Sequence, residues 1–207
     1  MQKQSLACGL VGQIVMATLW ISPASGQPAM DLPMLKVGDS WEFRQTDSPG
    51  DKTSKWSRTV AELAPEDRVR VRFGNGTIND FDAAMNFIPE GKTEFVRVLA
   101  KYPLKVGGEW SYSKRFTNPL LEERGTAKVV AYEAITVPAG TFSCYRVEID
   151  ASFSYRAFAE QRLWKRWYCP EVKWIAKEIL ETRTQSPNNP SGTSVATSEL
   201  VKFTPGP

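Results

Sequence analysis

The feature that most constrains this chain is the stretch of residues 137–177, which holds the only two cysteines outside the N-terminal apolar segment, Cys144 and Cys169. Residues 141–155 and 158–169 are rich in aromatic and β-branched side chains, a composition typical of strands. We therefore predict that these two segments form an antiparallel hairpin in which Cys144 lies opposite Cys169.

This pairing sets the register of the hairpin by counting. One face then carries an arginine on an indole ring and a carboxylate–ammonium pair, whereas the other carries large apolar contacts, as a half-buried hairpin requires. The predicted partners are Arg146 with Trp167, Glu148 with Lys165, Asp150 with Leu163, Tyr145 with Tyr168, and Ile149 with Trp164.

The reversal of this hairpin falls on Arg156 and Ala157. Neither residue readily adopts the positive φ that a tight two-residue turn favours, so we expect a longer or bulged connection. The next reversal is marked by Pro170, which cannot donate a backbone hydrogen bond to a ladder. Residues 170–172 should therefore turn the chain into a further strand.

A family resemblance lies in the same stretch. VPAGTFSCYRVEI (137–149) followed by WYCPEVKWIAKEI (167–179) resembles the C-terminal signature of a group of bacterial exported β proteins, the "domain of unknown function 3108-like" group. The resemblance implies an extracytoplasmic antiparallel β fold. It carries over no catalytic residue, so it leaves the function open.

The first 26 residues have the pattern of a signal peptide. Lys3 precedes an apolar run from Leu6 to Ile21, and small residues at 24–26 predict cleavage before Gln27. The run is too short and interrupted for a membrane span of about 20 apolar residues, although an uncleaved anchor is the alternative. We expect residues 1–26 to be removed and residues 27–207 to form a single periplasmic or secreted domain without a stable membrane span.

The charge of the chain argues against two classes of partner. The formal net charge is +3, and Lys3 is the only charged residue among residues 1–26, so residues 27–207 carry +2 (3 − 1). A nearly neutral chain without basic blocks favours neither nucleic acid nor a strongly anionic membrane.

Export also bears on the two cysteines, because thiols in an oxidising compartment normally pair. Directly opposed residues in an antiparallel hairpin have Cα atoms about 4.5–5.5 Å apart, a separation that a disulfide tolerates. Closing a loop of about 25 residues should contribute roughly 3 kcal/mol to stability. The alternative is two separate buried thiols.

The chain contains an internal repeat. LKVGDSWEF at residues 35–43 is matched by LKVGGEWSY at residues 104–112, 69 positions later. Each copy predicts a strand that begins after a glycine turn and places two aromatic side chains on one face. We interpret the repeat as two related β-meander halves that share one core. Chance similarity of two strand openings is the alternative.

Turn residues at short intervals and the absence of a sustained helical period predict an all-β fold. We expect an antiparallel sandwich or a strongly curved half-barrel of about eleven short strands. Residues 185–193 are expected to form a mobile loop. The predicted strands are residues 40–46, 55–63, 68–73, 77–87, 93–99, 109–116, 126–134, 141–155, 158–169, 173–184 and 194–203.

The composition argues against an enzyme. The chain has no histidine, which removes the commonest general base and the commonest transition-metal ligand. No glycine-rich phosphate loop is present. We interpret the carboxylate pairs Glu122-Glu123 and Asp80 with Asp82 as a solvated turn and the outer face of a strand, respectively. No cofactor, metal or catalytic residue is expected.

Aromatic side chains remain as candidates for function. They can fill the core of a β domain, or some can line the concave face of a curved sheet and hold a lipid-like, apolar or amphipathic ligand. The candidate ligand-binding residues are Trp164, Tyr145, Tyr168, Trp41 and Trp110. The alternative is an interaction module whose sheet edge or aromatic patch docks on another envelope protein. A carrier should have a continuous apolar cavity, whereas an interaction module should have a filled core.

Overall fold

The structure is a computed structural model that describes residues 28–89, 97–117, 120–155, 158–186 and 189–207. The predicted signal peptide lies outside the described residues. No helix in these ranges is long and apolar enough to cross a membrane.

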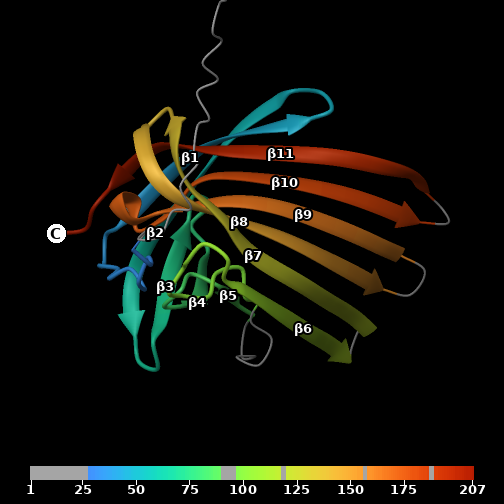
Figure 1. Cartoon of the computed structure of the whole chain (residues 1–207), viewed down its shortest axis with the longest axis horizontal. Coiled ribbons are helices and arrows are strands. Elements are labelled where there is room, and N and C mark those ends of the chain that lie inside the picture. Colours follow the sequence, from blue (N-terminus) through green and yellow to red (C-terminus); the bar gives the residue numbers. More distant parts are fainter. Residues whose placement is uncertain (1–27, 90–96, 118–119, 156–157, 187–188) are drawn as a thin grey trace, which may run out of the picture.

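All the described strands belong to one antiparallel sheet of eleven strands in the order β5-β4-β3-β2-β1-β11-β10-β9-β8-β7-β6. The prediction of an all-β fold is confirmed, in the form of a single open sheet and not a sandwich. In Figure 1, β9 to β11 run across the view and β3 to β5 run across their direction at the left, so the sheet is strongly twisted. The strands are β1 (Ser40–Ser48), β2 (Lys52–Ala64), β3 (Arg68–Phe73), β4 (Ile78–Asp82), β5 (Phe87–Ile88), β6 (Glu109–Thr117), β7 (Leu120–Val137), β8 (Gly140–Tyr155), β9 (Phe158–Cys169), β10 (Trp174–Ser186) and β11 (Asn189–Thr204).

Three predicted segments differ from the structure. The strand expected at 77–87 is divided into β4 and β5. Of the strand expected at 93–99, residues 90–96 lie outside the described residues and residues 97–99 are not in a strand. The loop expected at 185–193 is largely strand, because pairing continues to the end of the hairpin, where Ser186 pairs with Asn189.

The predicted register of the cysteine hairpin is confirmed at all five pairs, from Tyr145 with Tyr168 to Asp150 with Leu163. The expected longer or bulged connection is wrong. Pairing runs without a register shift to Tyr155 and Phe158, which leaves only residues 156 and 157 between the strands. Those two residues themselves lie outside the described residues.

The predicted disulfide joins Cys144 to Cys169, with a Cα–Cα distance of 4.2 Å. Both cysteines are fully buried. They are the chain neighbours of Tyr145 and Tyr168, so they point to the other face of the sheet. We call the face that carries Tyr145 and Tyr168 the inner face, and the face with the disulfide the outer face. After Cys169, residues Pro170–Val172 form one turn of 3₁₀ helix, as the proline predicted.

The internal repeat is present in the backbone. The glycine at the fourth position of each copy has positive φ, +92° at Gly38 and +90° at Gly107. Each copy makes the same pair of backbone hydrogen bonds to the following strand, and each is followed by a register shift, at Val60/Glu62 and at Val129/Ala131. The bonds are Gly38 N–H to Val60 O at 2.8 Å, Val60 N–H to Asp39 O at 2.9 Å, Gly107 N–H to Val129 O at 2.8 Å, and Val129 N–H to Gly108 O at 2.9 Å.

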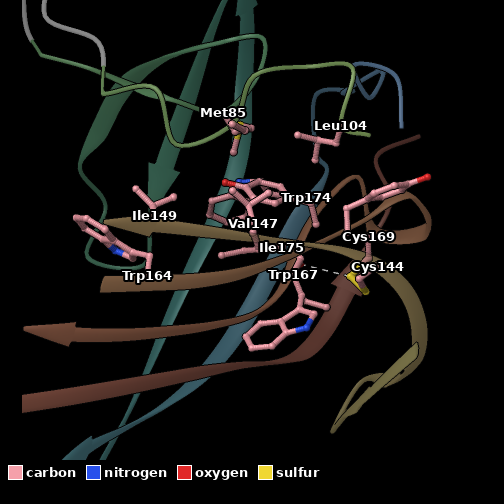
Figure 2. Packing of buried hydrophobic residues seen from close by; sticks show 14 of the residues in the cluster. Met85, Leu104, Cys144, Val147, Ile149, Trp164, Trp167, Cys169, Trp174 and Ile175 are labelled. Atoms are coloured by element: carbon pink, nitrogen blue, oxygen red, sulfur yellow. Dashed lines mark hydrogen bonds between the residues drawn. A yellow bond between two sulfur atoms is a disulfide. The ribbon is translucent and has the colours of Figure 1, made fainter. Parts of the chain in front are cut away.

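The two halves meet at the centre of the sheet, where β1 pairs with β11, and end at opposite edges, β5 and β6. The chain between β5 and β6 therefore passes from one edge to the other. Leu104 from this connection is fully buried and pairs with Met30 in an isolated bridge. Figure 2 shows Met85 and Leu104 over Val147 and Ile175 of the sheet, with Trp167 on the other side of the strands.

We expect the double change Cys144→Ala and Cys169→Ala to lower the free energy of unfolding by about 3 kcal/mol, because the bridge closes a loop in the unfolded chain. Denaturant unfolding of the oxidised protein and the double variant would measure the difference. The wild-type protein under reducing conditions should show the same loss. An unchanged midpoint in both cases would contradict this account.

Candidate functional site: the free edge of β6

All five aromatic residues predicted to hold a ligand are buried, with exposed fractions from 0% for Trp41 and Tyr168 to 9% for Trp110. The structure brings Tyr145 and Tyr168 together as an opposed pair on the inner face, and Trp164 lies on the same face four residues away along β9, opposite Ile149. Trp41 lies at the centre of the sheet against Trp174 and Phe203, with ring centroids 5.5 and 5.7 Å apart.

The polar atoms of these aromatic residues are bonded to the chain itself. The Tyr168 hydroxyl donates to Leu99 O at 3.1 Å, and Trp110 Nε1 donates to Val98 O at 2.8 Å. The Tyr145 hydroxyl bonds to Pro28 O, and Trp41 Nε1 donates to Val172 O at 2.7 Å. Segments of this chain therefore occupy the inner face where a ligand was expected.

A buried ion-pair network connects the inner face to β6. Glu123 on β7 is only 1% exposed and accepts two hydrogen bonds from Arg97, at 2.6 and 2.9 Å. The Tyr112 hydroxyl donates to the same carboxylate at 3.1 Å, and Lys114 Nζ lies 3.4 Å from it. Tyr112 and Lys114 both belong to β6, so this network holds β6 against β7 and the connection.

The interpretation of Glu122-Glu123 as a solvated turn is wrong, because both residues belong to β7. Adjacent residues of a strand point to opposite faces. Glu122 is thus on the outer face with Arg115 and Arg124, and Glu123 is on the inner face. Asp80 does lie beside arginines of β3, as the outer face of a strand predicted.

The charges of the network shift the pKa values of its members. Burial alone would raise the pKa of the Glu123 carboxyl, but the hydrogen bonds and charge of Arg97, together with Lys114 and Tyr112, lower it below its ordinary value. Burial, followed by the nearby Glu123 charge, raises the pKa of Tyr112. Glu123 is therefore ionised and Tyr112 is neutral at pH 7, as their hydrogen bond requires.

Gly125 gives Tyr112 the room to reach Glu123. The two residues are directly opposed in the β6–β7 pair. A Cβ atom at position 125 would lie 2.5 Å from the Tyr112 ring, so the ring lies flat over the backbone of β7. The glycine and the buried carboxylate together position the middle of β6.

The other side of β6 is a free edge. Among the described strands it is the last in the sheet, and β7 is the one strand there that pairs with it. No backbone hydrogen bond within the described residues reaches that edge. The opposite edge strand, β5, has only two residues, whereas β6 has nine.

Hydrogen bonding at the start of β6 indicates which peptide groups face this edge. Gly108 O accepts from Val129 N–H at 2.9 Å, so it points toward β7. Peptide groups alternate in direction along an antiparallel strand, and the β6–β7 pairing contains no register shift. The groups that face away from β7 are therefore those of Glu109, Ser111, Ser113 and Arg115.

Three open hollows meet at the same edge, with volumes of about 620, 760 and 680 Å³. Ser111 lines all three. Thr126 and Asp150 line the two hollows beside the outer-face residues of β6 to β8. The hollow of about 760 Å³ lies between β6 and the connection that joins β5 to β6. Leu32, Tyr102 and Trp110 line it.

The structure offers no arrangement for metal binding in the described ranges, where no group of three or more His, Cys, Asp or Glu residues could hold an ion. The sequence interpretation did not identify Arg97, Lys114 or the free edge. The alternation of Tyr112 and Lys114 with serines was the only sequence signal that these two side chains share one face of β6. The free edge could not be predicted, because the local pattern of a strand does not show its place in the sheet.

The described residues define the class of the protein: an all-β protein built as an open antiparallel sheet, with the Cys144–Cys169 disulfide and a long free edge at β6. No protein-family model matches the chain, and no curated protein matches it.

Among solved structures, the chain is similar to a "putative lipoprotein" from Parabacteroides distasonis, with a TM-score of 0.48, 15% identity, and coverage of 86% of this chain and 100% of that one. It is similar to a "putative exported protein with YmcC-like fold" from Bacteroides fragilis, with a TM-score of 0.42, 13% identity, and coverage of 86% and 100%. It is also similar to the hypothetical lipoprotein YmcC from Escherichia coli, with a TM-score of 0.44, 9% identity, and coverage of 82% and 85%.

Glu123→Gln should lower the free energy of unfolding by about 3 kcal/mol at pH 7, because it leaves Arg97 and Lys114 without their buried counter-charge. Glu122→Gln is the matched control and should change stability little, since its ion pairs are exposed. Denaturant unfolding at several pH values would measure both. Equal losses in the two variants would contradict the assignment of Glu123.

The loss of stability caused by Glu123→Gln should also depend on pH. The folded-state pKa of Glu123 is lowered, so its stabilisation is complete above the ordinary glutamate pKa of about 4.3 and is lost as the pH falls below that value. The difference in stability between the wild-type protein and Glu123→Gln should therefore shrink in acid.

Proposed function

We propose that this protein is an exported, non-catalytic protein of the cell envelope that binds a protein partner by accepting an extended segment at the free edge of β6. The observation that carries this proposal is the row of outward peptide groups on β6, from Glu109 to Arg115, beside three open hollows. In such strand addition, main-chain hydrogen bonds supply affinity and the flanking hollows receive alternate side chains.

The filled inner face favours this function over that of a ligand carrier. A carrier of an apolar molecule needs a largely preformed apolar cavity. Here Ala100 and Leu104 of the connection, together with Met30, are buried in the same core cluster as the strand residues of the inner face. The interaction class requires no cavity in that position.

The compartment is part of the proposal. Periplasmic or secreted localisation is supported by the predicted signal peptide at residues 1–26 and by the disulfide between Cys144 and Cys169. The resemblance to the "domain of unknown function 3108-like" group agrees with export and stays a prediction.

A photoreactive p-benzoylphenylalanine in place of Ser111 tests the proposal in intact cells. Irradiation should give one discrete adduct. Ser113→Pro should abolish that adduct, because proline removes an outward N–H without removing a bond to β7. Ser113→Ala, which keeps the N–H, should retain the adduct.

The same photoreactive residue in place of Glu42 is the control for position. Glu42 is exposed, and it lies on β1, which is paired on both sides, with β2 and with β11. An equal adduct from position 42, or an adduct at position 111 that survives Ser113→Pro, would refute strand addition at β6.

Ligand binding is the second candidate function, supported by the hollow of about 760 Å³ that Trp110 lines with Leu32 and Val98. Its mixed lining suits an amphipathic molecule. An apolar fluorescent dye should bind there. Leu32→Asp should weaken dye binding at least tenfold, because a charge would enter the apolar part of the lining.

Met34→Asp is the matched control for the dye titration. Met34 is more exposed than Leu32, at 87% against 47%, and it does not line the hollow. Dye affinity that is equal in both variants would exclude this hollow as the binding site.

A further inference from the structure

We infer that the strand accepted at β6 is β6 of a second copy of this chain, antiparallel and centred on Tyr112. This inference rests on the proposed function and names its partner. It joins three observations: the internal repeat, the outward peptide groups of β6, and the charges at the two ends of that strand.

The repeat shows what the vacant side of β6 can hold. β1 is the counterpart of β6 in the first half of the chain, and β1 is paired on both sides, with β2 and β11, each antiparallel. Asp39 O accepts from Val60 N–H at 2.9 Å, as Gly108 O does from Val129 N–H. The side of β1 that holds β11 is therefore the side that is free in β6, and an antiparallel strand fits there.

The pairing of β1 with β11 also shows how such a contact is matched in charge. Glu42 lies opposite Lys202, and Arg44 lies opposite Glu199, with a charged contact of 3.3 Å. Opposite charges face each other along this outer-face row, as favourable cross-strand pairs do.

The outward peptide groups of β6 restrict the register of a symmetric pair. They belong to Glu109, Ser111, Ser113 and Arg115, so these residues must face one another in the two copies. Five symmetric registers meet this condition, centred on the successive residues from Trp110 to Lys114.

Charge selects one of these five registers. Only the register centred on Tyr112 brings Glu109 opposite Arg115 of the second copy, and two-fold symmetry forms this contact twice. Both side chains are well exposed, at 61% and 63%, and their present partners are single residues of β7. The same register sets Ser111 opposite Ser113, whose short side chains leave the two strands room to approach.

Lys114 does not oppose this contact. Charged residues that point inward on edge strands are one device that prevents edge pairing. The Lys114 side chain is only 6% exposed and lies against Glu123 within its own copy. Its charge is compensated there, on the inner side of the sheet.

Sedimentation equilibrium of the purified protein tests the inference by charge reversal. The wild-type protein should form a dimer, and Arg115→Glu should raise its dissociation constant about tenfold, because two contacts become repulsive. The double variant Glu109→Arg and Arg115→Glu should restore dimerisation, since opposite charges face each other again. Arg183→Glu, an exposed arginine on β10 beside Glu181, is the matched control and should leave the dimer unchanged.

Cysteine cross-linking tests the register independently of charge. A mixture of the Ser111→Cys and Ser113→Cys variants should form a covalent dimer on mild oxidation, because these positions are opposed at about 5.5 Å between Cα atoms. Each variant alone should form far less, since position 111 then faces Ser113 and position 113 faces Ser111.

A monomer at every concentration would overturn the inference, as would a dimer that is insensitive to Arg115→Glu. The proposed function fails separately. If the wild-type protein is monomeric and the photoreactive residue at position 111 still captures another protein, in an adduct lost with Ser113→Pro, strand addition at β6 stands and the second copy is not its partner.

Discussion

An open sheet has an apolar face that no second sheet covers, and the structure depends on how this chain covers it. The connection between β5 and β6 crosses the inner face, and Asn86 holds it there. Asn86 Oδ1 accepts from the amides of Leu99 and Ala100 at 2.8 and 2.9 Å, and its Nδ2 donates to Ala100 O at 2.9 Å. Because the cover is irregular backbone, a buried side chain must satisfy its polar groups, and Asn86, 2% exposed, does so.

Much of the fold could be predicted from local pattern because the informative contacts are local. The Cys144–Cys169 pairing set the register of β8 and β9, since one correct pair determines every other pair in a regular ladder. The repeat could be recognised because Gly38 and Gly107 mark the same positive-φ turn. The choice between a sandwich and one open sheet could not be made, because it depends on whether β1 and β11 pair across most of the chain.

The candidate site was harder to predict for a related reason. The aromatic residues were correctly recognised as candidates for burial, but nothing in their pattern shows whether a ligand or the chain itself covers them. Glu123 illustrates the difficulty, because its neighbour Glu122 has the same chemistry and the opposite environment. Arg97, from outside the strands, reaches Glu123 together with Tyr112 and Lys114 of β6, whereas Glu122 faces exposed arginines on the other side of the sheet.

The pairing of β1 with β11 has a consequence for the order of folding. The first and last strands of the sheet are neighbours at its centre, so the two halves of the chain cannot join until nearly every residue has been made. Contacts between residues so distant in sequence form slowly. During that interval β1 has an unpaired side of its own. A chain that ends before β11 would keep its strands but would present two unprotected edges in place of a continuous sheet, a form prone to aggregation.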